Sequence, residues 1–272
     1  MQFYVITGII FFFLRTRVFG KILYIIAGSL RGGIMSVGSF EFFFKIYQDE
    51  VHLMLSIGDF LKSAYERADS PYHVLLETAK YIQWVPEPQN VAKFDWANVL
   101  DNASAYNSKN NTPVDWKILC KLKDQWLGGV KRSGCGQIGS AGLLLGFRYY
   151  VYKYLIETQI FKKYDWIVLS RADHIFACPF YYFLNFNSSH RTIYAPEGEE
   201  YFGVTDRFLV GAPTFFMKMI SITVDIFSDP DRWYHIMKFR SNWNLEQLIY
   251  FHLSQNNISV TFFPRLYFNT IL

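Results

Sequence analysis

The sequence predicts an α/β protein with one mixed, mostly parallel sheet flanked by helices. In the first third of the chain, apolar segments of strand length alternate with segments of helical pattern, which favours parallel strands joined by right-handed crossovers. The run that contains the strand Asp165–Ser170 is apolar almost throughout, as is typical of a central strand covered on both faces. The 272 residues are 51% hydrophobic and 18% charged, and no linker-like stretch divides them, so we expect one large core.

The first half of the chain holds three predicted strands and the helices between them. The strands are Lys21–Gly28, Val51–Ile57 and Tyr81–Val85. Helices are predicted at Ser39–Tyr47, at Phe60–Ala68 after a cap at Asp59, and at Tyr72–Lys80 after Ser70-Pro71. The polar, asparagine-rich segment Asn98–Pro113 predicts a surface loop.

The second half continues with helices and shorter strands. Helices are predicted at Trp116–Trp126, Leu143–Phe161, Pro213–Phe227 and, capped by Asn244, at Asn244–Ser254. Strands are predicted at Ile193–Ala195, Phe208–Gly211 and Ile258–Phe263, with a turn at Asp229–Arg232. The glycine-rich segment Gly128–Gly142 is either a lid or cradle for a ligand or a plain connector.

Composition narrows the class of function. The net charge of +4 is mild and includes no basic run, which argues against a nucleic-acid binder and is compatible with a small anionic ligand. Three widely spaced cysteines exclude a Cys-x-x-Cys metal or redox motif and argue against a disulfide scaffold. No G-x-G-x-x-G, Walker A or G-x-S-x-G motif is present, so dinucleotide, P-loop and serine hydrolase interpretations fail.

Residues 1–20 form a hydrophobic N-terminal extension, and residues 21–272 are expected to form a single domain. The apolar run Met1–Leu14 is shorter than the roughly 18 residues that a membrane span needs. It is either a marginal signal anchor or an element packed on the domain. A cytoplasmic or membrane-associated location follows, and four Asn-x-Ser/Thr sequons also permit the Golgi lumen in a eukaryote.

One group of candidate functional residues follows the strand Asp165–Ser170. Arg171, Asp173 and His174 stand where ligands bind in open α/β sheets, just beyond the carboxyl end of a central strand. A carboxylate at Asp173 could hold a divalent ion on a diphosphate, or it could simply pair with Arg171. The small residues after the first strand would let backbone N–H groups approach a ligand, and Arg31 could reach a phosphate.

A second group lies in the acidic segment Glu197–Arg207. Four carboxylates and an arginine alternate there with aromatic residues and glycines, which favours a site over a solvated loop. Such acids can bind sugar hydroxyls, act as a general base or ligate a metal. We expect this segment to fold back over the sheet edge that carries Arg171. Glu246 is a weaker candidate, because a glutamate near a helix N-terminus is commonly a surface residue.

In order, the segments AGSLRGG, YDWIVLSRADH, YAPEGEEYFGVTDRFLVGAP and NWNLEQLIYFHLSQNNISVTFFP resemble those of GT-A-type glycosyltransferases. The chain is similar, from about Lys21 to Pro264, to poorly characterised bacterial, viral and protist polysaccharide transferases. In those proteins an R-x-D motif replaces D-x-D, and a PEGEDYGGVTDRH-like segment follows. This chain departs from the pattern with Phe202 in place of Gly and Phe208 in place of His, changes that would alter acceptor choice or mark lost activity.

The resemblance implies a GT-A-like, Rossmann-type sheet and transfer of a sugar from a nucleotide-sugar donor to a glycan hydroxyl. It implies donor binding by Ala27, Gly28, Ser29, Arg31, Gly32, Arg171 and Asp173. Asp173 would hold Mn²⁺ or Mg²⁺, a requirement that Arg171 puts in question. Catalysis would fall to Asp206 and Glu199, and acceptor binding to Glu197, Tyr201, Arg207 and Glu246. The alternatives are a silent nucleotide- or sugar-binding protein on the same fold, and a hydrolase that uses the acidic segment.

Overall fold

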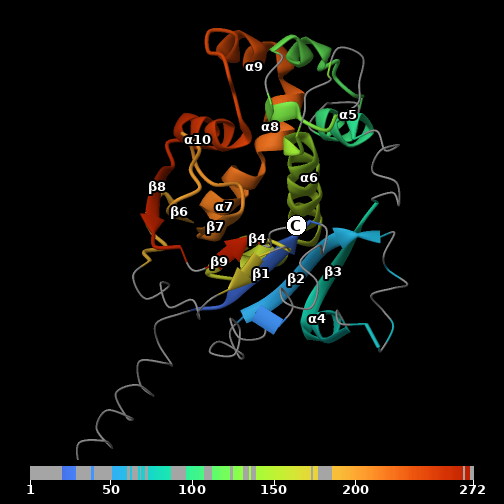
Figure 1. Ribbon diagram of the computed structural model, residues 1–272, viewed down its shortest axis with the longest axis vertical. Coiled ribbons are helices and arrows are strands. Elements are labelled where there is room, and N and C mark those ends of the chain that lie inside the picture. Colours follow the sequence, from blue (N-terminus) through green and yellow to red (C-terminus); the bar gives the residue numbers. More distant parts are fainter. Residues whose placement is uncertain are drawn as a thin grey trace, which may run out of the picture.

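The main sheet has seven strands in the order β3-β2-β1-β4-β7-β6-β8, and β5 pairs with β9 in a separate ribbon (Figure 1). The computed structural model describes residues 20–28, 38–39, 51–59, 62, 67, 69–70, 73–86, 96–106, 112–122, 125–130, 135, 139–172, 174–176, 186–265 and 267–269. The strands are β1 (Ile22–Ala27), β2 (Val51–Gly58), β3 (Ala79–Val85), β4 (Trp166–Arg171), β5 (His174–Phe176), β6 (Thr192–Pro196), β7 (Phe208–Gly211), β8 (Ser259–Phe263) and β9 (Tyr267–Asn269).

The sheet is mostly parallel, which confirms the predicted fold class. β1 pairs in parallel with β2 and with β4, β2 pairs in parallel with β3, and β6 in parallel with β8. Only β7 runs against its neighbours, β4 and β6. The chain winds outward from β1 to β3 and then returns to place β4 on the other side of β1. The carboxyl ends of β1 and β4 therefore flank the point where the winding reverses, which is the usual ligand position in open α/β sheets.

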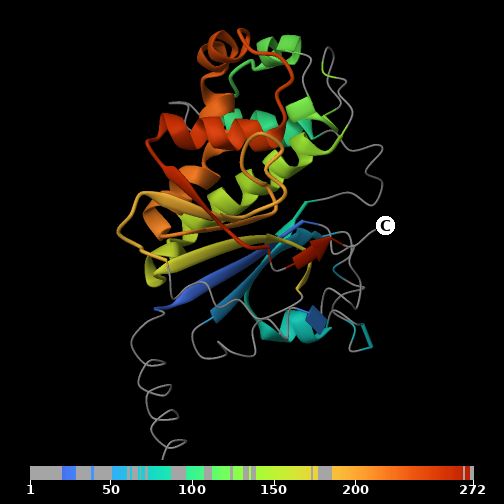
Figure 2. The same ribbon diagram turned by 60° about the vertical axis from the view of Figure 1, so that its left-hand side comes forward.

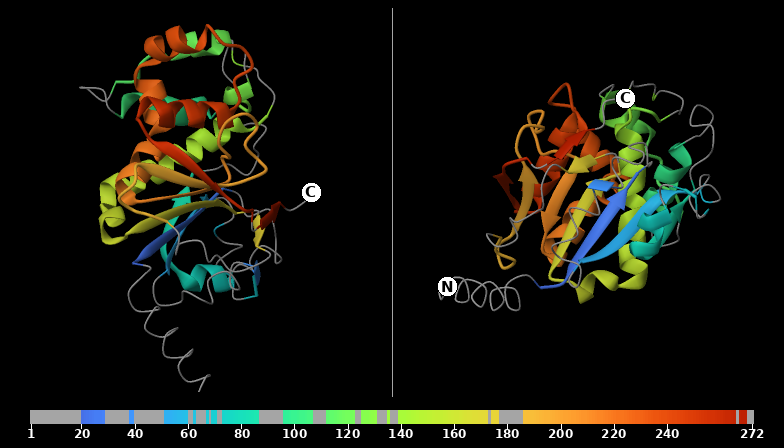
Figure 3. Two further views of the ribbon diagram at one scale, coloured as in Figure 1. Left: turned by 90° about the vertical axis from the view of Figure 1, so that its left-hand side faces the viewer. Right: turned by 60° about the horizontal axis from the view of Figure 1, so that its bottom comes forward.

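Most of the described helices cover one face of this sheet (Figure 2). They are α5 (Ala97–Ala105), α6 (Ala141–Thr158), α7 (Pro213–Ile220), α8 (Ile222–Ser228), α9 (Pro230–Met237), α10 (Leu245–Gln255) and the 3₁₀ helices η2 (Lys117–Leu122), η3 (Gln125–Leu127) and η4 (Ile160–Lys163). The short helix α4 (His73–Thr78) lies on the opposite face, as the side views show (Figure 3). Burial on both faces explains why the central strands read as continuous apolar runs.

Successive side chains of β1 contribute to two core clusters, one on each face of the sheet. Leu23 and Ile25 pack into the larger cluster, beneath α5 to α10. Ile22, Tyr24 and Ile26 point the other way, into a smaller cluster that contains Leu75 of α4. Successive side chains of a strand point to opposite faces, so one short segment contributes to both clusters.

Three sequence predictions in the helical layer are wrong. The first part of the predicted loop, residues 98–105, belongs to α5, because Val99, Leu100 and Ala103 give this helix a buried apolar stripe. The predicted turn at Asp229–Arg232 is the start of α9, which Asp229 caps by accepting a hydrogen bond from the Arg232 N–H. The predicted helix at Trp116–Trp126 is replaced by η2 and η3, where the buried Trp116 and Leu119 lie one 3₁₀ turn apart.

The helix predicted at Pro213–Phe227 is divided at Ser221 into α7 and α8. The Ser221 hydroxyl lies 2.9 Å from the Lys218 carbonyl and 2.8 Å from the Asp225 carboxylate. Local side-chain hydrogen bonds of this kind compete with the helical backbone and favour a break. The predicted α10 is confirmed together with its cap, since Asn244 and Gln247 form a reciprocal capping box.

A disulfide joins Cys120 to the buried Cys135 and closes a loop of about 15 residues. A single bridge supports the packed core and does not make the chain a disulfide scaffold. Within the described ranges, no helix is long and apolar enough to cross a membrane. The predicted helices at Ser39–Tyr47 and Phe60–Ala68 fall largely outside the residues that the structure describes, and the N-terminal extension falls outside them except for Gly20.

Candidate functional site

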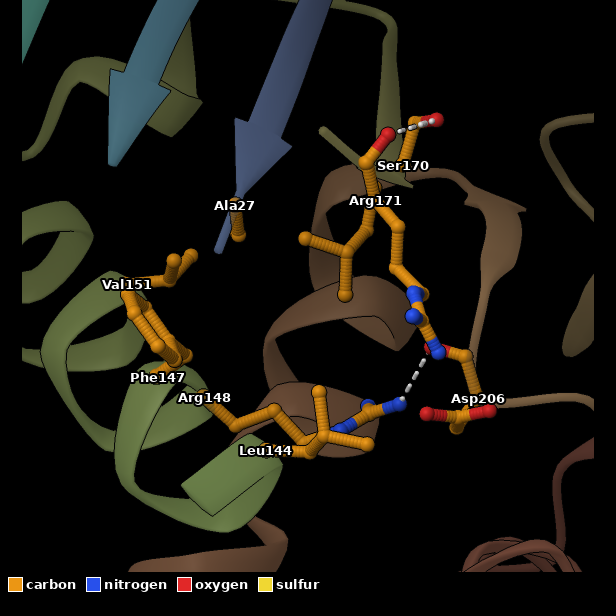
Figure 4. A pocket seen from close by; sticks show the side chains of 9 residues that line it. Ala27, Leu144, Phe147, Arg148, Val151, Ser170, Arg171 and Asp206 are labelled. Carbon is orange, nitrogen blue, oxygen red and sulfur yellow. Dashed lines mark hydrogen bonds between the residues drawn. The ribbon is translucent and has the colours of Figure 1, made fainter. Parts of the chain in front are cut away.

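A pocket opens at the reversal point of the sheet, between the carboxyl ends of β1 and β4 (Figure 4). The space that it encloses is small, about 20 Å³, and its mouth is open to solvent. The strands contribute Ala27, Leu169, Ser170 and Arg171, helix α6 contributes Leu144, Phe147, Arg148 and Val151, and the segment before β7 contributes Asp206. The predicted juxtaposition of the acidic segment with the β4 edge is thus confirmed for its last part.

The polar side of the pocket consists of two guanidinium groups and one carboxylate. Figure 4 shows Arg171 and Arg148 both extending toward Asp206, with Val151 and Phe147 on the opposite side of the pocket. One Arg148 nitrogen donates to the Asp206 carbonyl oxygen over 3.1 Å, and the Arg171 N–H donates to the Arg207 carbonyl over 3.1 Å. Because β7 is antiparallel to β4, the residues that enter β7 lie beside the end of β4. Topology therefore brings Asp206 to Arg171.

The Asp206 carboxylate is buried but not fully satisfied. The residue is 7% exposed, and its Oδ1 lies 3.7 Å from the Arg207 Nε. Its Oδ2 is buried and finds no hydrogen-bond partner among the residues that the structure describes. A buried carboxylate oxygen without a donor is costly unless something else supplies one. Asp206 therefore brings to the pocket wall a carboxylate oxygen that the described residues leave without a donor.

Arg148 supplies a buried positive charge behind this carboxylate. The residue is 3% exposed, and burial lowers the pKa of its guanidinium to about 10, an effect that Asp206 and Glu246 oppose. It is therefore still charged at neutral pH. Asp206 also affects Glu246. The pKa of Glu246 is raised above its ordinary value, first by burial and second by the negative charge of Asp206. Asp206, Glu246 and Arg148 therefore form one electrostatically linked group.

Glu199, the other predicted catalytic residue, does not line this pocket. It is 5% exposed, and its Oε1 accepts hydrogen bonds from Arg207 over 2.9 Å and from Arg265 over 3.1 Å. Arg265 follows β8, so Glu199 connects the acidic segment to the far edge of the sheet. Paired charges of this kind hold a segment in place. The placement favours a structural role over the catalytic one that the sequence predicts.

The predicted acceptor residues occupy different parts of the acidic segment. Glu197 and Tyr201 are exposed, whereas Arg207 is half-buried between Asp206 and Glu199. Glu246 is half-buried at the start of α10, and its carbonyl oxygen accepts from the Val204 N–H over 3.0 Å. The structure therefore brings Arg207 and Glu246 to the group around Asp206. Phe208 packs in the smaller core cluster against Tyr24, Phe176 and Phe263, away from the pocket lining.

Two of the predicted donor residues can be placed at the end of β1. Ala27 lines the pocket, and Gly28 follows it with φ +115° and its N–H bonded to the Ser56 carbonyl at 3.1 Å. That backbone conformation favours glycine, so the turn out of β1 depends on this residue. Ser29, Arg31, Gly32 and Asp173 lie outside the described residues.

Where the structure describes the chain, no cluster of three His, Cys, Asp or Glu side chains could hold a metal ion. The described pocket lining offers one carboxylate against two guanidinium groups, which suits an anion better than a divalent cation. These residues alone do not fit a metal. The metal site at Asp173 stays a prediction.

Sequence reasoning missed the contribution of helix α6 to the pocket. It predicted the helix Leu143–Phe161 but assigned no role to Arg148, Leu144, Phe147 or Val151. A charged residue at a position that the helix buries is a usable signal, because such residues are rarely buried without a partner. The missing information was the partner, which comes from a segment 58 residues further along the chain.

Comparison with known proteins finds similarity among solved structures. No family model matches the chain, and no curated protein matches it. Among solved structures, the chain is similar to mouse xyloside xylosyltransferase 1 in its apo form, with a TM-score of 0.42 and 9% identity over 89% of this chain and 84% of that one. A similarity at this level carries no argument about function, so the proposals below rest on the residues of the pocket.

Proposed function

We propose that the chain is a glycosyltransferase that binds a nucleotide-sugar in the pocket between β1 and β4 and transfers the sugar to a glycan hydroxyl. The observation that carries this proposal is the pocket wall: two arginines, Arg148 and Arg171, face a buried carboxylate, Asp206, whose Oδ2 has no hydrogen-bond partner in the described chain. Guanidinium groups suit the negative charge of a diphosphate, and an unpartnered carboxylate oxygen suits a hydroxyl. The motif resemblance noted in the sequence supports the same assignment.

The reaction assigns a definite task to each side of the pocket. The acceptor hydroxyl oxygen forms a bond to the anomeric carbon of the donor, and the bond from that carbon to the diphosphate oxygen breaks. The nucleoside diphosphate leaves with the bonding electrons, and the hydroxyl proton passes to Asp206 Oδ2. General base catalysis of this type contributes about 10²- to 10⁴-fold to rate. A single displacement of this kind predicts inversion at the anomeric carbon.

The arginines have separate tasks in this proposal. Arg171 lines the pocket at the end of β4 and neutralises charge on the donor diphosphate. Arg148 is almost fully enclosed and bonds the Asp206 carbonyl oxygen, so it holds the carboxylate in position and offsets its charge. A fixed charge in a site with little water stabilises developing charge more strongly than one in solvent. A divalent ion at Asp173 would share the neutralisation with Arg171.

The test is turnover with a panel of nucleotide-sugars and neutral oligosaccharides, with Mn²⁺, with Mg²⁺ and with EDTA. The proposal predicts release of nucleoside diphosphate that matches the glycosylated product one for one. If EDTA leaves the rate unchanged, Arg171 neutralises the diphosphate alone and the metal prediction is wrong. A nucleotide-sugar that binds but never reacts would identify the chain as a silent binding protein. Sugar release from an oligosaccharide without any nucleotide would identify a hydrolase.

A further inference from the structure

Two exposed aromatic side chains stand at the tip of the acidic segment. Phe202 is 90% exposed and Tyr201 is 53% exposed, although both sit in a segment whose following residues, Val204 to Asp206, are buried. Exposed aromatic rings within a polar segment commonly mark a binding surface.

The backbone beneath these two rings is strained. Tyr201 has φ +43° and Phe202 has φ +67°, in the left-handed region that side chains with a Cβ disfavour. Glycine would adopt this conformation without strain, and the resembled sequence segment has glycine at the position of Phe202. Burial of the Phe202 ring does not offset the free-energy cost of this backbone conformation, because the ring is almost fully exposed. Its presence is therefore not explained by the stability of the fold.

The strained tip is nevertheless held firmly. The Asn244 side-chain amide donates to the Tyr201 carbonyl over 2.9 Å, and the Gly203 N–H donates to the Glu200 carbonyl over 2.6 Å. Gly203 packs so tightly against the backbone of Glu246 that a Cβ there would overlap the Glu246 carbonyl. The rings are thus presented by a fixed backbone. The start of α10 that anchors them also carries Glu246, which is electrostatically linked to Asp206 and Arg148 of the pocket.

We infer that Tyr201 and Phe202 form an acceptor platform on which a sugar ring of the acceptor glycan stacks. The C–H face of a sugar ring packs on an aromatic face, and the neighbouring carboxylates Glu197 and Glu200 accept hydrogen bonds from its hydroxyls. Those carboxylates disfavour a nucleic acid. Two rings supply at most about 150 to 250 Å² each, well below the roughly 800 Å² per partner of a stable protein interface. This inference rests on the proposed function.

The test separates acceptor binding from donor binding. The full chain, its Y201A and F202A variants and the F202W variant are applied to a printed array of neutral oligosaccharides with a nucleoside diphosphate present. Phe239, which is 84% exposed beyond the end of α9, provides the matched control F239A. We expect wild type to bind at least one glycan, Y201A and F202A to bind it about tenfold more weakly, and F202W and F239A to bind as wild type. Phe202→Ala keeps a Cβ at the same φ, so the melting temperature should not move.

The inference is overturned if F202A binds as tightly as wild type, or if wild type binds no glycan on the array. Binding to phosphatidylcholine vesicles that F202A abolishes, without glycan binding, would assign the rings to a membrane surface and also overturn it. Donor binding is followed separately, by the melting temperature with nucleotide-sugars. A chain that binds glycans but no nucleotide-sugar would contradict the proposed function and leave the platform intact.

Discussion

Glu199 and Asp206 are two buried carboxylates on one segment, and their surroundings differ sharply. Glu199 accepts hydrogen bonds from two arginines, Arg207 and Arg265, the second of which follows the end of β8. Among the described residues, Asp206 has a 3.7 Å contact from Arg207 to one carboxylate oxygen and no hydrogen bond to the other. Burial alone therefore does not separate function from structure. The two carboxylates differ in whether the described chain supplies hydrogen-bond donors to them, and it leaves Oδ2 of Asp206 without one.

The largest difference is expected in activity. Asp206→Asn keeps the shape of the side chain but removes the proton acceptor, so sugar transfer should fall by at least about 100-fold. The melting temperature should fall less than that of Glu199→Gln, because the Asp206 carboxylate has a 3.7 Å contact with Arg207 and its Oδ2 makes no hydrogen bond within the described chain. Turnover and thermal unfolding are measured on the same preparation. Asp231→Asn on the exposed surface of α9 is the matched control and should leave the rate unchanged.

Glu199→Gln should show the opposite pattern. The change removes the charge that pairs with Arg207 and Arg265 and should lower the free energy of unfolding by about 2 kcal/mol. At a temperature where the variant is folded, transfer should retain most of its rate. Denaturant unfolding gives the free energy, and Glu197→Gln, at an exposed position, is the control. A rate loss as large as that of Asp206→Asn, with unchanged stability, would instead make Glu199 catalytic.

Phe202→Gly tests the tip of the same segment. Glycine removes the left-handed strain at φ +67°, and this gain should exceed the extra entropy of the unfolded chain by about 0.5 to 1 kcal/mol. The variant should therefore unfold at a higher denaturant concentration while it binds acceptor glycan more weakly. Phe202→Ala serves as the comparison, since it removes the ring but keeps the strain. Equal stability of the two variants would refute the assigned strain.

The smallest effect concerns pH. The pKa of Glu246 is raised by burial and by Asp206, so its contribution to stability is fully present below the ordinary value of 4.5 and is lost as pH rises through the raised value. Glu246→Gln should therefore match wild type at pH 4 and melt about 1 to 2 °C higher at pH 7. Melting curves across this range test the sign. A variant that is less stable at pH 7 would show that the carboxylate is stabilised, not penalised, by Arg148.

The sheet could be predicted from sequence because its strands are defined by local patterns. β1, β2 and β4 are short apolar runs with polar ends, and both their faces are buried. Helix α5 was not predicted, since its two asparagines and its serine suggest a loop and the buried stripe of Val99, Leu100 and Ala103 explains it. That stripe stabilises the helix through contact with α8, which no local pattern reveals.

Functional side chains that lie at the ends of strands could be predicted from the sequence. Those whose role depends on contacts with residues far along the chain could not. Arg171 and Asp206 were expected near one another, because both border strands of the same sheet, and the structure confirms this. The contrast between Glu199 and Asp206 could not be read from the sequence. It depends on Arg265, which lies 66 residues beyond Glu199 and reaches it only through the pairing of β6 with β8.

The central claim is that the pocket between β1 and β4 binds a nucleotide-sugar through Arg171. The most direct test is the melting temperature of wild type, of Arg171→Met and of the surface control Arg232→Met with a panel of nucleotide-sugars. The account predicts that at least one donor raises the melting temperature of wild type and of Arg232→Met. It predicts that Arg171→Met loses most of that increase, because it keeps the side-chain stem but not the charge. No increase with any donor, or an equal increase in Arg171→Met, would contradict it.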